Sequence, residues 1–337
     1  MGGSEIDRIV AELPGLDGLD GFWDAMDARL AQGGAAFLAD LGIALRTTYG
    51  NRPVPHARAV VDGLLRRLAL LPWPGHVPQV LRLAAGAGIA TRYVASILAG
   101  GQDLTELAPA LQHDVPAALR ACLVQELVLR GARDPAAMPV GHPLSVLPGV
   151  RTALEDDPPL PRYGLDWTGR PDTLAPITVT PALTDDPTDV PPFMAGPAPS
   201  GTDAAVTSWT SATVGTRLVE LVEPLPVSAV PDVVAALCLE RVGTEVAGAP
   251  CPVRAVWRLL FAAASLGGAH GLGEYGAYGR LAAWRALGAL CGAGEHAHVG
   301  DIERRATECA WYRFRVDKRP DGAFHDLGLA ALAAGGR

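Results

Sequence analysis

The sequence WRLLFAAASLGGAHGLGEYGAYGRLAAWRALGAL, at residues 257–290, decides most of the expected fold. Apolar residues recur at helical spacing at both of its ends, and a glycine-rich stretch at 267–279 separates them. Glycine leaves room for the close approach of another segment or of a ligand. The sequence therefore predicts two apolar helices joined by a glycine hinge whose polar residues could line a pocket. These residues are His270, Glu274, Tyr275, Tyr278 and Arg280.

Residues 1–131 predict a helical array. Apolar residues recur at helical spacing, and the segments end near glycine or proline. Short helices with one apolar stripe bury it by stacking on their neighbours. We find no fixed repeat period, so the array is irregular and HEAT-like at most. Trp73, between two prolines, is interpreted as a packing wedge and not as a ligand platform, and His76 has no partner at ligand spacing.

Residues 132–203 predict a long connector or lid. They are rich in Pro, Asp and Thr, and proline is excluded from helix interiors and central strands. Within this segment, residues 175–183 alternate weakly in polarity, as a strand does.

Residues 204–337 predict a C-terminal helical domain with a small β element. The β-branched, alternating stretch 204–222 favours a strand or a hairpin that bends at Gly215. After the hinge, apolar spacing predicts one helix over 302–314, and Asp326 is placed to cap a final helix. The predicted fold class is mostly α, an irregular helical array with a small β insertion.

Composition excludes several classes of protein. The net charge of −8 argues against general nucleic-acid binding, which needs a basic surface. No run of about 18 apolar residues predicts a membrane span. The N-terminus lacks the pattern of a secretory signal, so a soluble, cytoplasmic protein is expected. The basic residues are almost all arginine, which indicates a GC-rich, actinobacterial genome.

The five cysteines are expected to be reduced thiols. They are scattered and form no C-x-x-C pair, so they do not match a zinc signature. Cys122 and Cys238 lie in apolar helical patterns and are predicted to be small core residues.

The hinge carries the candidate catalytic residues. If it folds over a cleft, Arg280 could bind a carboxylate or phosphate, Glu274 could act as a general base, and Tyr278 could orient a substrate or donate a proton. Tyr275 and Trp284 are candidate ligand-binding residues beside them. Arg313 is a further candidate, because arginines and aromatic residues cluster around it. The alternative is that the Glu and Arg form a structural pair and that the aromatic residues belong to the core.

We expect no cofactor and no metal. His270 and Glu274, with His296, His298 and Asp301, include ligand types for zinc or iron, but no metal motif is present, and these histidines are interpreted as surface groups. The sequence GAHGLG at 268–273 follows an apolar helix and not a strand, so the context of a dinucleotide-binding loop is missing.

Three pieces of the chain together resemble a largely actinobacterial family known only as a domain of unknown function. They are residues 257–292, residues 208–220 (SWTSATVGTRLVE) and residues 325–337 (HDLGLAALAAGGR), and the block GAYGRLAAWR at 276–285 is the most specific. The chain departs from the family pattern at His270, where the family has an aromatic residue, and at His325, where it has Trp. The resemblance implies that the hinge is special and brings over no catalytic residue.

Two functional hypotheses remain. The first is a cofactor-independent enzyme of specialised metabolism that acts on a small polar or anionic metabolite at 267–280. It predicts that Glu274, Tyr278 and Arg280 converge on one accessible cavity. The second is a non-catalytic interaction or scaffold protein that binds a partner on the helical array. It predicts that these residues are buried and that the largest exposed apolar patch lies on 54–131. The oligomeric state stays open.

Overall fold

The computed structural model describes residues 3–50, 52, 54–85, 90–111, 115–165, 193–208, 216–226, 229–230, 232–234, 236, 246–267, 273–317 and 325–333. The chain divides into two compact units. The first consists of Met1–Ser145 and Pro161–Pro171, and the second of Val146–Leu160 and Asp172–Arg337. Residues 132–203 are thus shared between the two units, and the predicted boundaries at 131 and 203 stay predictions.

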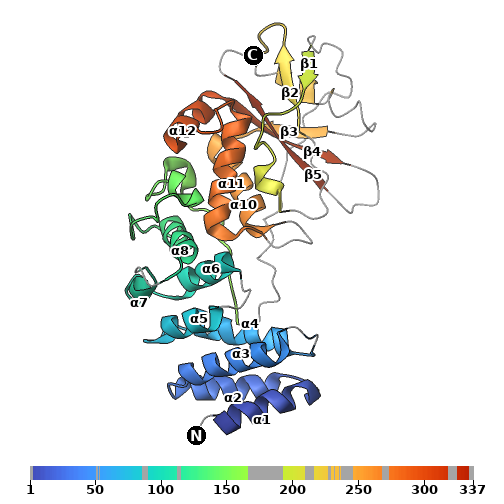
Figure 1. Cartoon of the computed structure of the whole chain (residues 1–337). Helices are drawn as coiled ribbons and strands as arrows, with labels where there is room; N and C mark the ends of the chain where they lie inside the picture. The colour runs from blue at the N-terminus through green and yellow to red at the C-terminus, as the bar shows by residue number, and fades with distance from the viewer. Residues whose placement is uncertain are drawn as a thin grey trace. The chain divides into compact units, whose positions relative to one another are not determined.

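The first unit is a stack of helices, in which α1 to α8 follow one another from blue to green (Figure 1). Its helices are α1 (Gly3–Glu12), α2 (Asp20–Ala31), α3 (Ala35–Tyr49), α4 (Ala57–Leu70), α5 (His76–Ala84), α6 (Thr91–Gly101), α7 (Leu104–Leu107) and α8 (Ala117–Leu129). Neighbours in the sequence, such as α3 with α4 and α4 with α5, pack on each other. None of the helices that the structure describes is long and apolar enough to cross a membrane.

Apolar side chains at helical spacing build the core of this stack. Leu38, Leu41 and Leu45 on α3 are almost fully buried, as are Leu64 and Leu68 on α4. A residue repeats on one face of a helix every three or four positions, so each helix buries a continuous stripe against its neighbours. The prediction of a mostly α fold is confirmed.

Helix α2 packs closely on α4 through an aromatic side chain. A Cβ atom on Gly63 of α4 would lie 2.4 Å from the Trp23 ring of α2, so only glycine fits there. The Arg67 guanidinium stacks on the same ring at 4.0 Å and donates to the Asp27 carboxylate at 2.6 Å. This arrangement fixes the first two turns of α2 beside the middle and second half of α4.

The second unit contains the predicted pair of apolar helices, α10 (Val253–Leu266) and α11 (Tyr275–Leu290). Trp257 and Trp284 approach each other between the two helices, with ring centroids 6.2 Å apart. A Cβ atom on Gly279 would lie 2.7 Å from the Cβ atom of Ser265, and one on Gly273 would lie 2.2 Å from the Ser265 carbonyl oxygen. The glycines therefore permit the close backbone approach that the sequence predicted.

Two small antiparallel sheets lie in the described part of the second unit. Strands β1 (Phe193–Gly196) and β2 (Leu218–Leu221) form a two-stranded ribbon. The other sheet has the order β3-β4-β5, from β3 (Val246–Pro250), β4 (Ala310–Asp317) and β5 (His325–Leu332). Buried residues from β4, β5 and the segment 225–234, among them Leu225, Val233 and Tyr312, form a core cluster.

The prediction of one helix over 302–314 is wrong at its C-terminal end. Helix α12 (Val299–Glu308) stops before Cys309, and β4 begins at Ala310. Aromatic and charged residues alternate along β4, so the period changes from that of a helix to that of a strand.

The predicted final helix capped by Asp326 is also wrong, because this residue lies on β5 opposite Val316. The Phe314 ring covers Gly328 on the paired strand, where a Cβ atom would lie 2.1 Å from the ring. Pairing with β4 therefore overrides the helical propensity of this Ala- and Leu-rich segment.

The predicted strand or hairpin over 204–222 is partly corrected. Residues 218–221 form β2, but this strand pairs with β1, and residues 204–206 form a short 3-10 helix. Gly215 and the weak strand pattern at 175–183 lie outside the described residues.

Candidate functional site

Arg280 lies on α11 and is fully buried, as is its partner Glu155. The guanidinium donates from Nε to Glu155 Oε1 and from Nη2 to Glu155 Oε2, both at 2.6 Å. It also donates to the carbonyl oxygens of Pro148 and Val150, both at 2.9 Å. A substrate anion would have to displace Glu155 to reach this guanidinium.

The Glu155 carboxylate also accepts hydrogen bonds from two segments of the second unit. Trp284 Nε1 donates to Oε1 at 2.7 Å, and the Thr152 backbone N–H donates to Oε2 at 2.8 Å. The latter bond belongs to a capping box around the short 3-10 helix Ala153–Glu155. With Arg280, this carboxylate therefore binds four donors, and the group fastens the segment 148–155 to α11.

The sequence did not identify Glu155, because we interpreted its surroundings as connector. A signal was present: Thr152-x-x-Glu155 has the pattern of a capping box. The pattern could have predicted the cap but not the ion pair, since Arg280 lies 125 residues away.

Of the predicted site residues, Arg280 and Trp284 meet at Glu155 Oε1, to which both donate, and none of the predicted residues lines the described hollow of the first unit. Glu274 precedes α11 and donates its backbone N–H to the Ala264 carbonyl at 2.7 Å. Tyr275 and Tyr278 are half-buried in the first turns of α11, and Trp284 is buried against Glu155. Arg313 lies on β4, between Ala249 of β3 and Leu329 of β5. The predicted catalytic and ligand-binding roles of these residues stay predictions.

The metal hypothesis falls partly outside the described residues, because His270 lies there. Within the described ranges, no group of three or more His, Cys, Asp or Glu side chains could hold a metal ion. His296, His298 and Asp301 are exposed around the start of α12.

The four described cysteines are poor nucleophiles, because burial raises the pKa of each thiol. The pKa of Cys122 rises to about 12, through burial first and the charge of Glu126 second. The pKa of Cys309 rises to about 11 for the same main reason. Burial also raises the pKa values of Cys251 and Cys291. Since the thiolate is the reactive form, these groups are unsuited to covalent catalysis at neutral pH.

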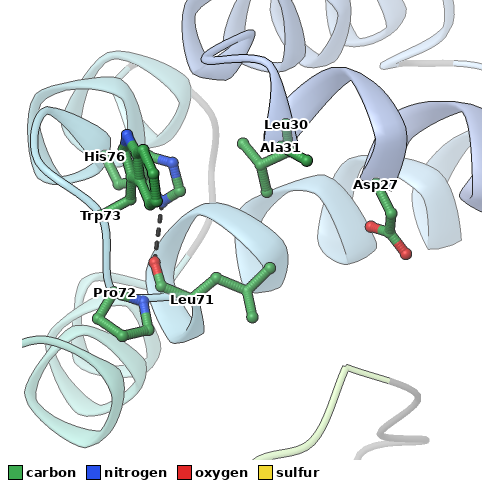
Figure 2. A pocket seen from close by; sticks show the side chains of 7 residues that line it. All are labelled: Asp27, Leu30, Ala31, Leu71, Pro72, Trp73 and His76. Carbon is green, nitrogen blue, oxygen red and sulfur yellow. Dashed lines mark hydrogen bonds between the residues drawn. The ribbon is translucent and has the colours of Figure 1, made fainter.

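The first unit contains a hollow of about 170 Å³ between α2, the end of α4 and the start of α5 (Figure 2). We call it the Trp73 hollow. Trp73 and His76 lie on one side of it in Figure 2, and Leu30 and Ala31 of α2 lie across from them. Its lining is mostly apolar and consists of Asp27, Leu30, Ala31, Leu71, Pro72, Trp73 and His76.

The chain forms this hollow because α4 must end and reverse within a few residues. Pro72 cannot continue the helix, and Gly75 takes a positive φ of 85° directly before α5. The turn between them carries Trp73, whose residue surface is 57% exposed. The interpretation of Trp73 as a packing wedge is therefore wrong, because more than half of the residue is exposed.

His76 supplies the buried polar group of the hollow. It is only 2% exposed, and its Nδ1 lies 2.8 Å from the Leu71 carbonyl oxygen. A carbonyl oxygen only accepts, so Nδ1 carries the proton, and in the neutral ring Nε2 offers a lone pair. Nε2 is buried and has no hydrogen-bond partner. An unsatisfied buried acceptor costs about 1–3 kcal/mol, which a ligand with a donor would recover.

Sequence reasoning named Trp73 and His76 without assigning them a site. The missing information was the position of α2, because Leu30 and Ala31 approach this turn from about forty positions earlier in the chain. Such contacts arise from the stacking of the helices and leave no local pattern in the sequence.

The profile of a family of unknown function, DUF6183, matches residues 20–337 of the chain. No curated protein and no solved structure matches the chain. The match covers the Trp73 hollow and the Arg280 ion pair alike, so it does not favour either place as the functional site.

Proposed function

We propose that this chain, which belongs to the DUF6183 family of unknown function, is an interaction protein that binds a partner protein segment at the Trp73 hollow. The exposed indole of Trp73 beside an open apolar hollow is the observation that carries the proposal. Tryptophan is enriched among the few interface residues that dominate binding energies. A mostly apolar hollow with a few polar side chains in its wall, here Asp27 and His76, has the composition of a recognition pocket.

The helical unit supports this function through its rigidity. Leu71 is held from both sides, because its carbonyl oxygen accepts from His76 Nδ1 and from Gln102 Nε2 at 3.0 Å. Asp27 is held by Arg67 at the opposite rim. A preformed pocket loses little conformational entropy on binding, so more of the contact energy appears as affinity.

Exposed apolar residues alone do not single out the helical array. Of the eight large apolar side chains that are exposed among the described residues, only Trp73 and Leu104 lie in 54–131. Trp73 is the largest of them, and it is the one that lines the described hollow. The proposal therefore rests on the combination of exposure, hollow and unpaired acceptor at this place.

The competing hypothesis of a cofactor-independent enzyme at 267–280 has less support. It requires the Arg280 guanidinium to face a substrate, whereas this group donates to Glu155, Pro148 and Val150 inside the protein. We propose the cytoplasm as the place of binding, and an actinobacterial source and a role in specialised metabolism stay predictions.

The test is a selection of peptides from a random display library against the full-length chain. Trp73→Ala and Leu104→Ala serve as the paired variants, because both residues are exposed on the same unit and Leu104 does not line the hollow. We expect selected peptides to lose about 2 kcal/mol or more of binding energy on Trp73→Ala and to bind Leu104→Ala as they bind the wild type.

Thermal unfolding of the two variants is the control for their folding. Because Trp73 is mostly exposed, its replacement should change the free energy of unfolding by no more than about 0.5 kcal/mol. Selection of peptides that bind wild type and Trp73→Ala equally well would contradict the proposal.

A further inference from the structure

We infer that the Trp73 hollow receives an arginine side chain from a basic segment of the partner protein. This inference deepens the proposed function and rests on it. It combines four features of the first unit: a stripe of carboxylates, the indole of Trp73, the lone pair of His76 and the apolar floor of the hollow.

The carboxylates follow one face of α2, and Asp27, the last of them, lines the hollow. Asp20, Asp24 and Asp27 are four and three residues apart, so they lie above one another on the helix, and Ala31 continues the same face at the rim of the hollow. All three carboxylates are exposed. Asp27 binds Arg67, whereas Asp20 and Asp24 have no ion-pair partner among the described residues. The stripe favours a cationic ligand and repels phosphate.

The buried acceptor selects for a donor. In the neutral ring, His76 Nε2 can only accept a hydrogen bond, and it is almost completely shielded from water. A ligand group that reaches this atom must therefore be an N–H or O–H donor. A guanidinium combines such donors with the positive charge that the carboxylate stripe attracts.

The same unit contains the contact that we infer for Trp73. The Arg67 guanidinium stacks on the Trp23 ring at 4.0 Å while it donates to a carboxylate, and the Arg29 guanidinium lies 4.1 Å from the centre of the Phe37 ring. The exposed indole of Trp73 can accept a partner arginine in the same way. Stacking on an aromatic face together with fixed donors distinguishes arginine from lysine, whose ammonium is a strongly hydrated point charge.

The apolar lining suits the rest of the side chain. The methylene groups of an arginine can cover Leu30, Leu71 and Pro72 while the guanidinium lies between the Trp73 indole and His76. Because the hollow is open, the cation keeps part of its hydration, which limits the cost of desolvation. Charge complementarity agrees, since the whole chain has a net charge of −8.

The experiment compares three fluorescein-labelled, end-blocked pentapeptides, Gly-Xaa-Gly-Xaa-Gly, by fluorescence anisotropy with the full-length chain. Xaa is arginine, lysine or citrulline, and citrulline keeps the planar shape of arginine but has no charge. We expect the arginine peptide to bind about threefold tighter than the lysine peptide and about tenfold tighter than the citrulline peptide.

Variants then assign the affinity to the hollow. Trp73→Ala should weaken binding of the arginine peptide about fivefold. His76→Asn keeps a donor for the Leu71 carbonyl but removes Nε2, so it should weaken binding about fivefold while the thermal unfolding midpoint stays close to that of the wild type.

Charge variants test the stripe. Asp24→Asn should weaken binding about twofold at low salt and have no effect at high salt, because the carboxylate is exposed. Asp7→Asn is the matched control, as Asp7 is an exposed carboxylate on α1 that does not line the hollow. It should leave the affinity unchanged.

Five outcomes would overturn the inference. Equal affinity for the arginine and citrulline peptides would show that the charge does not contribute to binding. Unchanged affinity of Trp73→Ala for the arginine peptide would show that the peptide does not bind at the Trp73 hollow. If free L-arginine binds as tightly as the peptide, the ligand of the hollow is a small molecule and not a segment of a partner protein. If library peptides without arginine bind in a Trp73-dependent manner, the arginine inference fails and the proposed function stands. If no peptide depends on Trp73, both fail.

Discussion

Replacement of Glu155 by glutamine should strongly destabilise the second unit. Both Glu155 and Arg280 are 0% exposed, so Glu155→Gln leaves a guanidinium charge inside the protein without its counter-charge. Each carboxylate oxygen accepts two donors: Arg280 and Trp284 at Oε1, Arg280 and Thr152 at Oε2. Whichever way the new amide is turned, its NH₂ group faces two of these donors.

The size of the effect follows from known buried pairs. Removal of one partner of a buried ion pair costs about 3–5 kcal/mol, mostly because the other charge stays buried. Domains of ordinary stability have about 5–15 kcal/mol in total. We therefore expect Glu155→Gln to lower the free energy of unfolding by about 3–5 kcal/mol, a large share of the total.

Equilibrium unfolding in urea, followed by tryptophan fluorescence, measures this change. The neighbouring Asp156 provides a matched control, because it binds Arg254 with side-chain exposures of 59% and 46%. Asp156→Asn should cost no more than about 1 kcal/mol, as solvent screens an exposed pair. The double replacement Glu155→Leu with Arg280→Met should be more stable than Glu155→Gln, because it leaves no unpaired charge.

An equal midpoint for Glu155→Gln and Asp156→Asn would refute this reasoning. Arg280 would then not depend on Glu155 for its burial, and its guanidinium could turn toward a ligand. The hypothesis of a substrate anion at the glycine hinge would regain its support.

Other predictions concern packing and pH. Gly279→Ala should lower the free energy of unfolding by about 1–3 kcal/mol, because the new Cβ would lie 2.7 Å from Ser265 Cβ. Gly21→Ala, where no atom lies within 4 Å, should raise it by up to about 1 kcal/mol in the same urea assay. The stability should fall as the pH rises from 9.0 toward about 12, because burial raises the pKa of Cys122 to about 12 and that of Cys309 to about 11. The thiols of the unfolded state lose their protons at a lower pH than those of the folded state, so alkali favours the unfolded state. Cys122→Ala should therefore reduce the loss of stability with rising pH. An unchanged pH dependence of stability in this variant would contradict the role assigned to Cys122.

The glycine hinge could be predicted from the sequence because its signals are local. The apolar spacing of α10 and α11 and the glycines between them all lie within one short stretch. The close approach of Gly279 to Ser265 follows from that spacing and is present in the structure. Periodicity works well here because both helices bury most of their surface.

Strands β4 and β5 could not be predicted in the same way. The segment HDLGLAAL of β5 has apolar spacing that also fits a helix, and only its pairing with β4 fixes it as a strand. The decisive contact joins Phe314 and Gly328, two residues on different strands. Secondary structure that depends on such tertiary pairing is not encoded by a single window of sequence.

The candidate site could not be predicted from the sequence for a related reason. Trp73 and His76 are visible in the sequence, but their importance depends on Leu30 and Ala31, which α2 brings to the same hollow. The role of Arg280 likewise depends on Glu155, from a segment that looked like a connector. In both cases the sequence identified some residues of the site, and the residues that contact them became apparent only from the packing of the chain.

Mapping of a photo-crosslink is the most direct test of the central claim. The tightest peptide from the library selection would carry a benzophenone beside its anchor residue and be crosslinked to the full-length chain, and the attached residues identified by mass spectrometry. The account predicts crosslinks within 27–31 and 71–76, which line the Trp73 hollow, and their loss in Trp73→Ala. Crosslinks that instead fall on 273–285, around Arg280, would contradict it and return the site to the glycine hinge.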